Sequence, residues 1–225
     1  MFPYPAFYVT GTDTGIGKTV TSSTLLHALR GRGLRAVGMK PLASGCEQTA
    51  EGWRNEDALA LQAASFPRPD YALVNPYALP QPLAPEIAAA EAGVPIELAP
   101  LRAAFAQLRA MADVVVVEGV GGWAAPLSGS LDQADLARAL DLPVVLVVGM
   151  RLGCLNHARL SAAAIAADGL RCVGWVANEV DPDMARRDEN FALLRARLSM
   201  PCWGRIPYDP ASAPAHLAGH LQLPD

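Results

Sequence analysis

The stretch "AFYVTGTDTGIGKTV" at residues 6–20 decides the fold, because it joins an apolar run to a glycine-bearing loop and then to a helix. The run at 6–10 predicts a buried strand. In this order, backbone N–H groups and the helix N-terminus can face phosphates, a lysine can reach the β and γ oxygens, and a threonine hydroxyl can ligate Mg²⁺. Lys18 and Thr19 occupy those two positions. We therefore predict a phosphate-binding loop at residues 11–19.

The loop departs from the common pattern at one glycine. The pattern G-x-x-x-x-G-K-[ST] requires glycine at position 12, but Thr12 stands there and Gly11 comes one residue early. An ordinary strand-to-helix turn could contain Gly15 and Gly17, yet it would have no reason to end in Gly-Lys-Thr. The sequence therefore favours a variant nucleotide-binding loop over a simple turn.

Strand-like and helix-like segments alternate along almost the whole chain. Short apolar or β-branched runs predict buried parallel strands, and alanine- and leucine-rich segments predict helices between them. The strands are expected at 6–10, 35–39, 114–117, 144–148, 172–177 and 202–206, and the helices at 18–30, 55–64, 98–110, 131–140, 156–167 and 183–198. This alternation predicts an α/β fold with a doubly wound, mainly parallel sheet, helices on both faces and ligands at the carboxyl ends of the strands, of the P-loop NTPase type.

One domain is expected over residues 1–225, with a proline-rich excursion at about 66–100. That excursion holds eight prolines, which exclude a long regular element. A short helix at 84–92 fits, because Pro85 would lie in its first turn. The end of the chain, 207–225, is expected to be a loop-like tail.

The charge and composition of the chain limit the kinds of partner that it is expected to bind. A net charge of −4 and a pI near 5.6 provide no basic footprint for nucleic acid or an anionic membrane. No run reaches the roughly 18 apolar residues of a membrane span, and the first residues do not read as a signal peptide, so a cytoplasmic location is expected. The four cysteines form no CxxC pair, which argues against a zinc site or a disulfide frame.

Lysine is scarce in this chain. Of 18 basic residues, 16 are arginine, which leaves only Lys18 and Lys40. Lysine carries a compact ammonium on a thin stem, where a planar guanidinium would not fit. Lys40 and Ser44 lie in "GMKPLASG" (38–45), at the end of the second predicted strand. We expect this strand to neighbour the first, so that Lys40 lies where a γ-phosphate meets a second substrate.

Two acidic residues are candidates for completing a metal site. "VVVVEGVGG" (114–122) delivers Glu118 to the end of a buried strand, just before glycines that allow the backbone to approach a ligand. "RNEDALA" (54–60) places Asp57 at the start of a helix. Asp57 alone is equally well explained as an exposed acid that stabilises a helix N-terminus. Glu118 is the stronger candidate, because an acid between a buried strand and glycines is not simply solvated surface.

Several motifs together resemble the dethiobiotin synthetase family over about residues 7–209. They are "GTDTGIGKT", "KPLASG", "RNEDALAL", "VNPYAL", "VEGVGGW", "LPVVLVVGMRLGCLNH" and "GWVANEV". The resemblance implies an ATP-dependent ligase of biotin biosynthesis that closes a ureido ring on 7,8-diaminononanoate with CO₂, ATP and Mg²⁺. A substrate amine captures CO₂ as a carbamate, the carbamate oxygen attacks the γ-phosphate, and the neighbouring amine opens the mixed anhydride. Dethiobiotin, ADP and phosphate are the products.

The resemblance also assigns site residues. ATP contacts are implied for Gly15, Ile16, Gly17, Lys18, Thr19, Val20, Asp57, Glu118, Gly119, Val120, Gly121, Asn178, Glu179, Pro207, Tyr208 and Asp209, with Asn178 at the adenine edge. Mg²⁺ ligands are Thr19, Asp57 and Glu118, and substrate contacts are Thr14, Ser44, Gly153, Cys154 and Asn156. Lys18 and Lys40 are the catalytic residues, because a carbamate and a triphosphate are both anions and need cations between them. We assign no general base.

The segment "RLGCLNHA" (151–158) opens a helix, whose N-terminus can bind an anion. In the family this loop reaches across a homodimer interface towards the substrate carboxylate. Arg151 stands where other members carry lysine, which puts a contact from that side chain in doubt. The Cys154 thiol and His157 are expected to be packing groups rather than reactive ones.

The sequence leaves alternatives open both for the nucleotide that is bound and for the function of the protein. Asn178 and Asp181 have the spacing of a guanine-reading motif, but Glu179 replaces its lysine, so ATP is favoured. A regulatory or positioning ATPase of the dimeric P-loop group would carry an extra lysine early in the loop, where this chain has Thr12 and Asp13. A cobyrinate amide synthetase would need a glutaminase domain, and a simple kinase would leave "KPLASG" unexplained.

Overall fold

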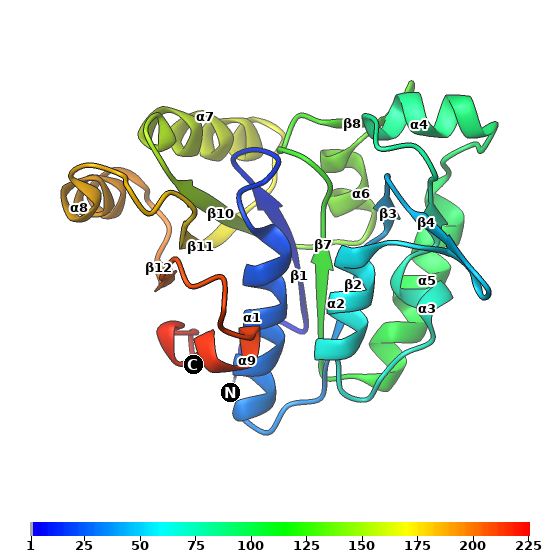
Figure 1. Cartoon of the computed structure of the whole chain (residues 1–225), viewed down its shortest axis with the longest axis horizontal. Coiled ribbons are helices and arrows are strands. Elements are labelled where there is room, and N and C mark those ends of the chain that lie inside the picture. Colours follow the sequence, from blue (N-terminus) through cyan, green and yellow to red (C-terminus); the bar gives the residue numbers. More distant parts are fainter. Residues whose placement is uncertain (1) are drawn as a thin grey trace.

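The computed structural model describes residues 2–225, and a six-stranded parallel sheet forms its centre (Figure 1). The strands are β1 (Ala6–Gly11), β2 (Ala36–Met39), β7 (Val114–Glu118), β10 (Val144–Met150), β11 (Cys172–Glu179) and β12 (Cys202–Ile206). Every residue of β1, β2, β7 and β10 is buried, because helices cover both faces of the sheet. The predicted strands are confirmed.

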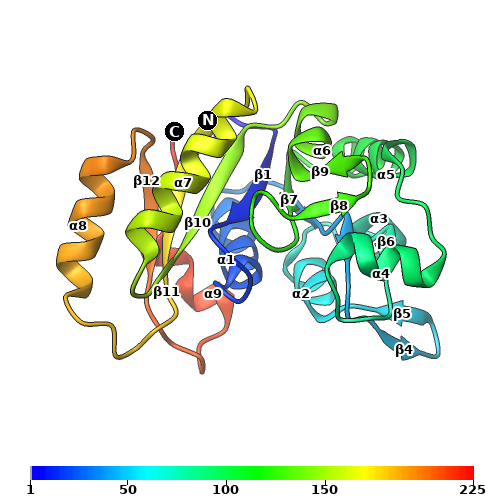
Figure 2. The same cartoon turned by 90° about the horizontal axis from the view of Figure 1, so that it is seen from above.

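Helices lie in one layer on each face of the sheet (Figure 2). α1 (Lys18–Gly31), α2 (Glu56–Ala64), α3 (Tyr71–Val74) and α9 (Pro214–Leu217) contribute to one core, and α5 (Leu98–Met111), α6 (Gln133–Ala139), α7 (Cys154–Ala167) and α8 (Arg187–Arg197) to the other. Leu25 and Leu61 lie in the first core, Leu101 and Leu194 in the second. The doubly wound architecture is therefore as predicted.

The strand order corrects one expectation. The order is β12-β11-β10-β1-β7-β2, so the second strand does not neighbour the first. β7 lies between them, with Val9 opposite Glu118 on one side and Gly38 opposite Val116 on the other. The four valines of β7 suit this central place, since they are apolar on both faces. Glu118 thus comes directly beside the strand that leads into the phosphate loop, and Lys40 lies one strand farther away.

The proline-rich segment is more ordered than an excursion suggests. β3 (Leu42–Ala43) pairs with β6 (Tyr77–Ala78), and α4 (Pro85–Ala92) forms with Pro85 in its first turn, as expected. Leu42, Leu79 and Ala88 belong to a third, small core. Two short hairpins, β4 (Glu47–Thr49) with β5 (Gly52–Arg54) and β8 (Pro126–Ser128) with β9 (Leu131–Asp132), complete this side.

The C-terminal tail is not a loose loop, which corrects a second expectation. It forms α9 and a 3₁₀ turn, η1 (Ala218–His220), that pack on α1. Leu217 and Leu223 are buried there, and Leu221 bridges to Gly204 on the outer strand. Within residues 2–225, no helix combines the length and apolar character needed to cross a membrane.

Candidate active site

The phosphate loop takes a shape that requires glycine. Gly15 and Gly17 adopt left-handed backbone conformations, with φ of 70° and 75°, and Gly17 caps α1. Asn178 Nδ2 donates to the Ile16 carbonyl at 2.9 Å, and a side chain at position 17 would collide with this amide. Lys18 Nζ donates to the Asp13 carbonyl at 2.9 Å. The loop is thus held from within and from the end of β11.

A cavity of 430 Å³ opens beside this loop. It lies at the carboxyl ends of β1, β2 and β7, where ligands bind in open α/β sheets. Its lining is Thr14, Gly15, Gly17, Lys18, Thr19, Val20, Lys40, Ala43, Ser44, Asn55, Asp57, Val120 and Gly121. The structure therefore brings together predicted residues from four separate segments.

Lys40 lies at the centre of the acidic group. Its Nζ donates to Glu118 Oε1 at 2.6 Å and to Asp57 Oδ2 at 2.9 Å, and Thr19 Oγ1 donates to Glu118 Oε1 at 2.8 Å. The side chains of Lys40 and Glu118 are 3% and 0% exposed, whereas that of Asp57 is 37% exposed. The ammonium thus stands among the three residues predicted to hold Mg²⁺.

Burial and charge shift the pKa values here in different directions. Burial disfavours the charged form of Lys40, but Glu118 and Asp57 outweigh it and raise the pKa of Lys40. Burial alone would raise the pKa of the Asp57 carboxyl, but the neighbouring Lys40 ammonium holds that pKa below its usual range. Burial, and next the charge of Lys40, lower the pKa of Lys18 to about 8. An anion entering the cavity would relieve the crowding of the two ammonium groups.

The donor set fits Mg²⁺. Glu118 Oε2 is buried and has no hydrogen-bond partner within residues 2–225, so a ligand is needed to satisfy it. The remaining donors are a carboxylate and a hydroxyl, which are hard oxygens. Mg²⁺ is usually held by one or two carboxylates together with phosphates and waters. Thr19, Asp57 and Glu118 can supply the protein share of such a shell.

A second hollow, of 280 Å³, shares Gly15, Gly17 and Val20 with the first. Its other lining residues are Asn178, Glu179, Val180, Pro207, Tyr208, Asp209, Pro210 and Leu217. Glu179 accepts from Arg205 Nε at 2.6 Å and from an Arg187 guanidinium nitrogen at 2.7 Å. Its carboxylate is therefore neutralised, and the hollow offers mainly apolar walls and amide groups to a planar base.

Some predicted residues lie outside these two hollows. Ile16 is buried in the core beneath the loop, and Glu118 and Gly119 stand behind the lining. Gly153, Cys154 and Asn156 are at the start of α7 and line neither hollow. Gly153 and Asn156 are exposed, whereas Cys154 is buried and burial raises the pKa of its thiol. Arg151 of this segment pairs with Asp13 in the phosphate loop, but the three residues predicted to contact the substrate line neither hollow.

Three residues of the site were not predicted. Asn55 caps α2 by accepting from the Ala58 N–H at 3.2 Å, and it donates to the Ser44 carbonyl at 3.3 Å. An asparagine just before acidic residues at the start of a helix is a recognisable signal for such a cap. Asn75 donates to the Lys40 carbonyl at 2.7 Å, and Gln133 donates to the loop after β7. No local sequence pattern predicts either contact.

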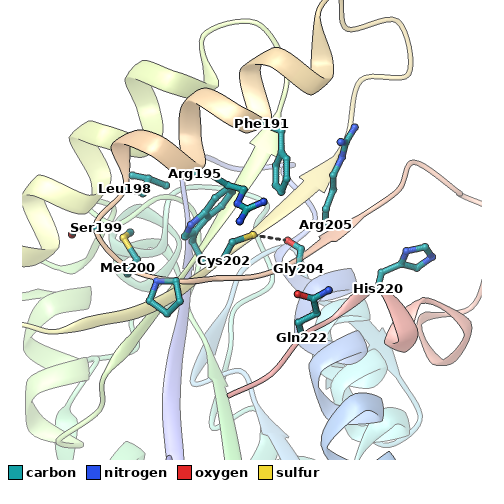
Figure 3. Close-up of a pocket in the computed structure, with 12 residues that line it drawn as sticks. Phe191, Arg195, Leu198, Ser199, Met200, Cys202, Gly204, Arg205, His220 and Gln222 are labelled. Atoms are coloured by element: carbon teal, nitrogen blue, oxygen red, sulfur yellow. Dashed lines mark hydrogen bonds between the residues drawn. The ribbon is translucent and has the colours of Figure 1, made fainter. Parts of the chain in front are cut away.

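A larger hollow lies elsewhere. A cavity of 730 Å³ opens at the outer edge of the sheet, between α8, β12 and the C-terminal segment (Figure 3). Arg195, Arg205 and His220 line it, and no residue predicted to be functional does. Size alone does not identify an active site. We place the candidate site in the smaller cavity, because the phosphate loop, Lys40 and Asp57 line it together.

Solved structures with the same architecture have little sequence in common with the chain. The MinC:MinD cell division protein complex of Aquifex aeolicus matches with a TM-score of 0.57 at 14% identity, over 96% of this chain and 86% of that one. The signal recognition particle receptor FtsY of Elizabethkingia anophelis, in complex with GDP, matches with a TM-score of 0.53 at 17% identity, over 100% of this chain and 61% of that one. These likenesses establish the fold alone.

Full-length relatives are far more similar. The ATP-dependent dethiobiotin synthetase BioD of Xanthomonas euvesicatoria is 73% identical over 98% of this chain and 99% of its own length. The proteins of the same name from Xanthomonas oryzae and Xylella fastidiosa are 74% and 70% identical, over 98% and 96% of this chain and equal shares of their own. The protein family described as "AAA domain" matches residues 5–216. With this identity over nearly its whole length, the chain belongs to the ATP-dependent dethiobiotin synthetase family.

Proposed function

We propose that this protein is an ATP-dependent ligase of biotin biosynthesis that converts 7,8-diaminononanoate, CO₂ and ATP into dethiobiotin, ADP and phosphate. One observation carries the proposal: an ammonium from outside the phosphate loop, that of Lys40, lies between Glu118 and Asp57 in the same cavity as Thr14 and Ser44. An enzyme that brings a carbamate to a γ-phosphate needs cations between these two anions, and Lys40 lies where it can supply one.

The chemistry begins with two anions that repel each other. One amine of the substrate adds to CO₂ and loses a proton, which gives a carbamate. Lys18 and Lys40 would hold the triphosphate and the carbamate at the contact distance for transfer, with Thr14 and Ser44 beside the carbamate. When bound, Mg²⁺ would neutralise phosphate charge, held by Thr19, Asp57 and Glu118.

Two bond exchanges follow. The carbamate oxygen attacks the γ-phosphorus as the bond to ADP breaks, giving a carbamic-phosphoric anhydride. The second amine then attacks the anhydride carbonyl, loses a proton, and expels phosphate to close the ureido ring. No histidine lines the cavity within residues 2–225, so we assign no protein base and place the amine proton on solvent or phosphate.

For the nucleotide, we propose that ATP places its base in the hollow beyond Gly17. Asn178 uses its Nδ2 on the Ile16 carbonyl, which leaves its Oδ1 for the amino group of adenine. The paired Glu179 is not available to accept from guanine, and Pro207, Tyr208 and Asp209 complete the walls.

We further propose that residues 1–225 act as one domain in a cytoplasmic homodimer. Leu152, just before α7, and Leu160, within it, are 92% and 62% exposed, and both leave apolar surface that a second copy could cover. A second copy covering them would bring Gly153 and Asn156 to the carboxylate end of the substrate. This would form a shared site, because within residues 2–225 these two residues line neither hollow of the single chain.

The test is phosphate release from purified protein given Mg²⁺ and ATP. Release should require both diaminononanoate and bicarbonate, and omission of either should abolish it. Hydrolysis that proceeds without diaminononanoate and rises with DNA or lipid vesicles would instead support a nucleotide switch, the alternative function.

A further inference from the structure

The loop at residues 119–122, which follows β7, forms part of the wall of the reaction cavity. Val120 and Gly121 line it next to Thr14 and Lys40. Loops with this many glycines hold a shape only when something outside them fixes it. The structure provides such a support behind the loop, in two side chains that the proposed mechanism does not use.

The support consists of Gln133 and Tyr8, both 0% exposed. Gln133 Nε2 donates to the carbonyls of Val120 and Gly122, at 2.6 and 2.5 Å. Tyr8 Oη donates to Gln133 Oε1 at 2.6 Å. Because the tyrosine hydroxyl occupies the amide oxygen, the amide nitrogen must face the loop. All of the amide's hydrogen-bonding groups are thereby committed.

These bonds determine how Gly121 is presented. Its two flanking carbonyls point to Gln133, and Gly121 itself has a φ of 66°, which favours glycine. The C=O and N–H of one trans peptide point in opposite directions, so the Gly121 N–H points away from Gln133. The structure, over residues 2–225, records no protein acceptor for it. A Cβ built on Gly121 would lie 3.7 Å from Thr14 Oγ1, so the residue itself lies close to Thr14.

Position 119 fits the same arrangement. A Cβ on Gly119 would collide with Gln133 Oε1 and lie 2.6 Å from Tyr8 Oη. The glycine therefore gives the buried amide and hydroxyl the space they need directly against the backbone. The loop, the amide and the hydroxyl form one packed unit.

We infer that Gln133, oriented by Tyr8, is a positioning residue of the ring-closing reaction: it holds the 119–122 loop so that the Gly121 N–H faces the oxygen atoms of the carbamate. The inference rests on the proposed function for its substrate. Gln133 itself touches no substrate. Its effect passes through the backbone of the loop.

The first experiment compares Gln133→Met with Gln62→Met. Gln62 is a matched control, since it is also buried, donates to the Pro69 carbonyl at 2.9 Å and accepts from Arg68 at 3.1 Å, but it lies away from the cavity. Both variants lose a buried amide and should lose thermal stability. Only Gln133→Met should lower kcat, by at least tenfold, while KM for ATP stays within twofold. Only it should speed amide hydrogen exchange of a peptide covering 119–125, by at least fivefold.

A second variant separates positioning from stability. Gln133→Met leaves the Tyr8 hydroxyl buried without a partner, and adding Tyr8→Phe removes that orphaned group. The double variant should regain most of the lost Tm but keep the fast loop exchange and the low kcat. If the single variant does not fold, the double variant is compared with wild type and with Gln62→Met in the same measurements. Recovery of kcat together with Tm, or unchanged loop exchange, would overturn the inference.

The two proposals fail in different ways. If wild-type protein shows no phosphate release that depends on diaminononanoate, the proposed function fails. Hydrogen exchange needs no substrate, so slow exchange at 119–125 in Gln133→Met would refute the positioning role whatever the reaction is.

Discussion

Among single residues, Lys40 has the most demanding surroundings. It is buried with one fully buried carboxylate and one partly exposed carboxylate. A buried ion pair gains little net stability, because removing both charges from water offsets their attraction, yet losing one partner costs about 3–5 kcal/mol. We therefore attribute the lysine to function. Its compact ammonium lies 2.9 Å from Asp57 Oδ2 and 3.4 Å from the Gly119 carbonyl, where a guanidinium would need more space.

A Lys40→Arg variant tests this directly. The positive charge is kept, but the planar group cannot lie on both Glu118 and Asp57 and also reach a carbamate. We expect nucleotide binding to remain within a few-fold of wild type and kcat to fall by about 10²–10³. Fluorescent-nucleotide titration and phosphate release measure the two. Normal turnover would show that the scarcity of lysine carries no functional meaning.

The proposed role of Glu118 as a metal ligand can be tested against a control substitution at Asp113, just before the other end of β7. Glu118→Gln replaces a carboxylate by a neutral amide, which is a weaker ligand for Mg²⁺. The Mg²⁺ concentration at half-maximal activity should therefore rise at least about tenfold. Asp113→Asn changes an acid at the start of the same strand, where it pairs with Arg35 far from the cavity, and should leave the Mg²⁺ requirement unchanged. Chelation with EDTA should stop phosphate release in all three proteins. An equal Mg²⁺ requirement in wild type and Glu118→Gln would exclude the carboxylate from the metal shell.

Among helices, strands and loops, the features that could be predicted from the sequence are those that depend on a few neighbouring residues. The valines of β7, the Pro85 start of α4 and the glycines of the phosphate loop each act within a few residues, and each was recognisable. The order of strands depends on how a long connection crosses the sheet, which no local pattern encodes, so the place of β7 was missed.

The site shows the same division. Lys18, Thr19 and Glu118 follow directly from strand ends and a loop, and could be assigned as candidates from the sequence. Tyr8 and Gln133 meet although 125 positions separate them in the sequence, and Leu217 and Leu223 are buried in the same core as the leucines of α1. Contacts of this kind depend on tertiary packing, so they could not be predicted from spacing.

The packing of β11 on β12 yields a prediction about stability alone. A Cβ at Gly174 would collide with the indole of Trp203, so Gly174→Ala should lower the free energy of unfolding by about 1–3 kcal/mol. Gly31→Ala, at the end of α1, meets no atom and should be neutral or stabilising by up to about 1 kcal/mol. Urea denaturation measures both. If the two variants lose equal stability, the close contact with Trp203 is not what excludes a side chain at Gly174.

For the whole molecule, the central question is what covers α7. Within residues 2–225, the groups of its first turn that we predict to bind substrate line neither hollow, and Leu152 and Leu160 are exposed. Both facts have one explanation if two copies meet there. The net charge of −4 is small enough for apolar contact to bring like molecules together.

Leu160→Asp should therefore convert the protein into a monomer at micromolar concentration, because a carboxylate would be buried without a partner in the interface. Diaminononanoate turnover should fall with it. Leu59→Asp, on the exposed side of α2, changes a similar leucine and should alter neither property. Sedimentation velocity gives the oligomeric state. A dimeric Leu160→Asp protein would place the interface elsewhere.

The ammonium at position 40 has a further consequence for how this protein can change over generations. In the resting molecule it is the counter-ion of Glu118, and without it that acid would be stranded in the interior. A descendant that no longer needs the reaction cannot simply discard the lysine, since the fold would suffer before any benefit appeared. Losing Glu118 instead would deprive the buried ammonium of its closest partner, so the stability of the empty protein opposes the loss of either residue alone.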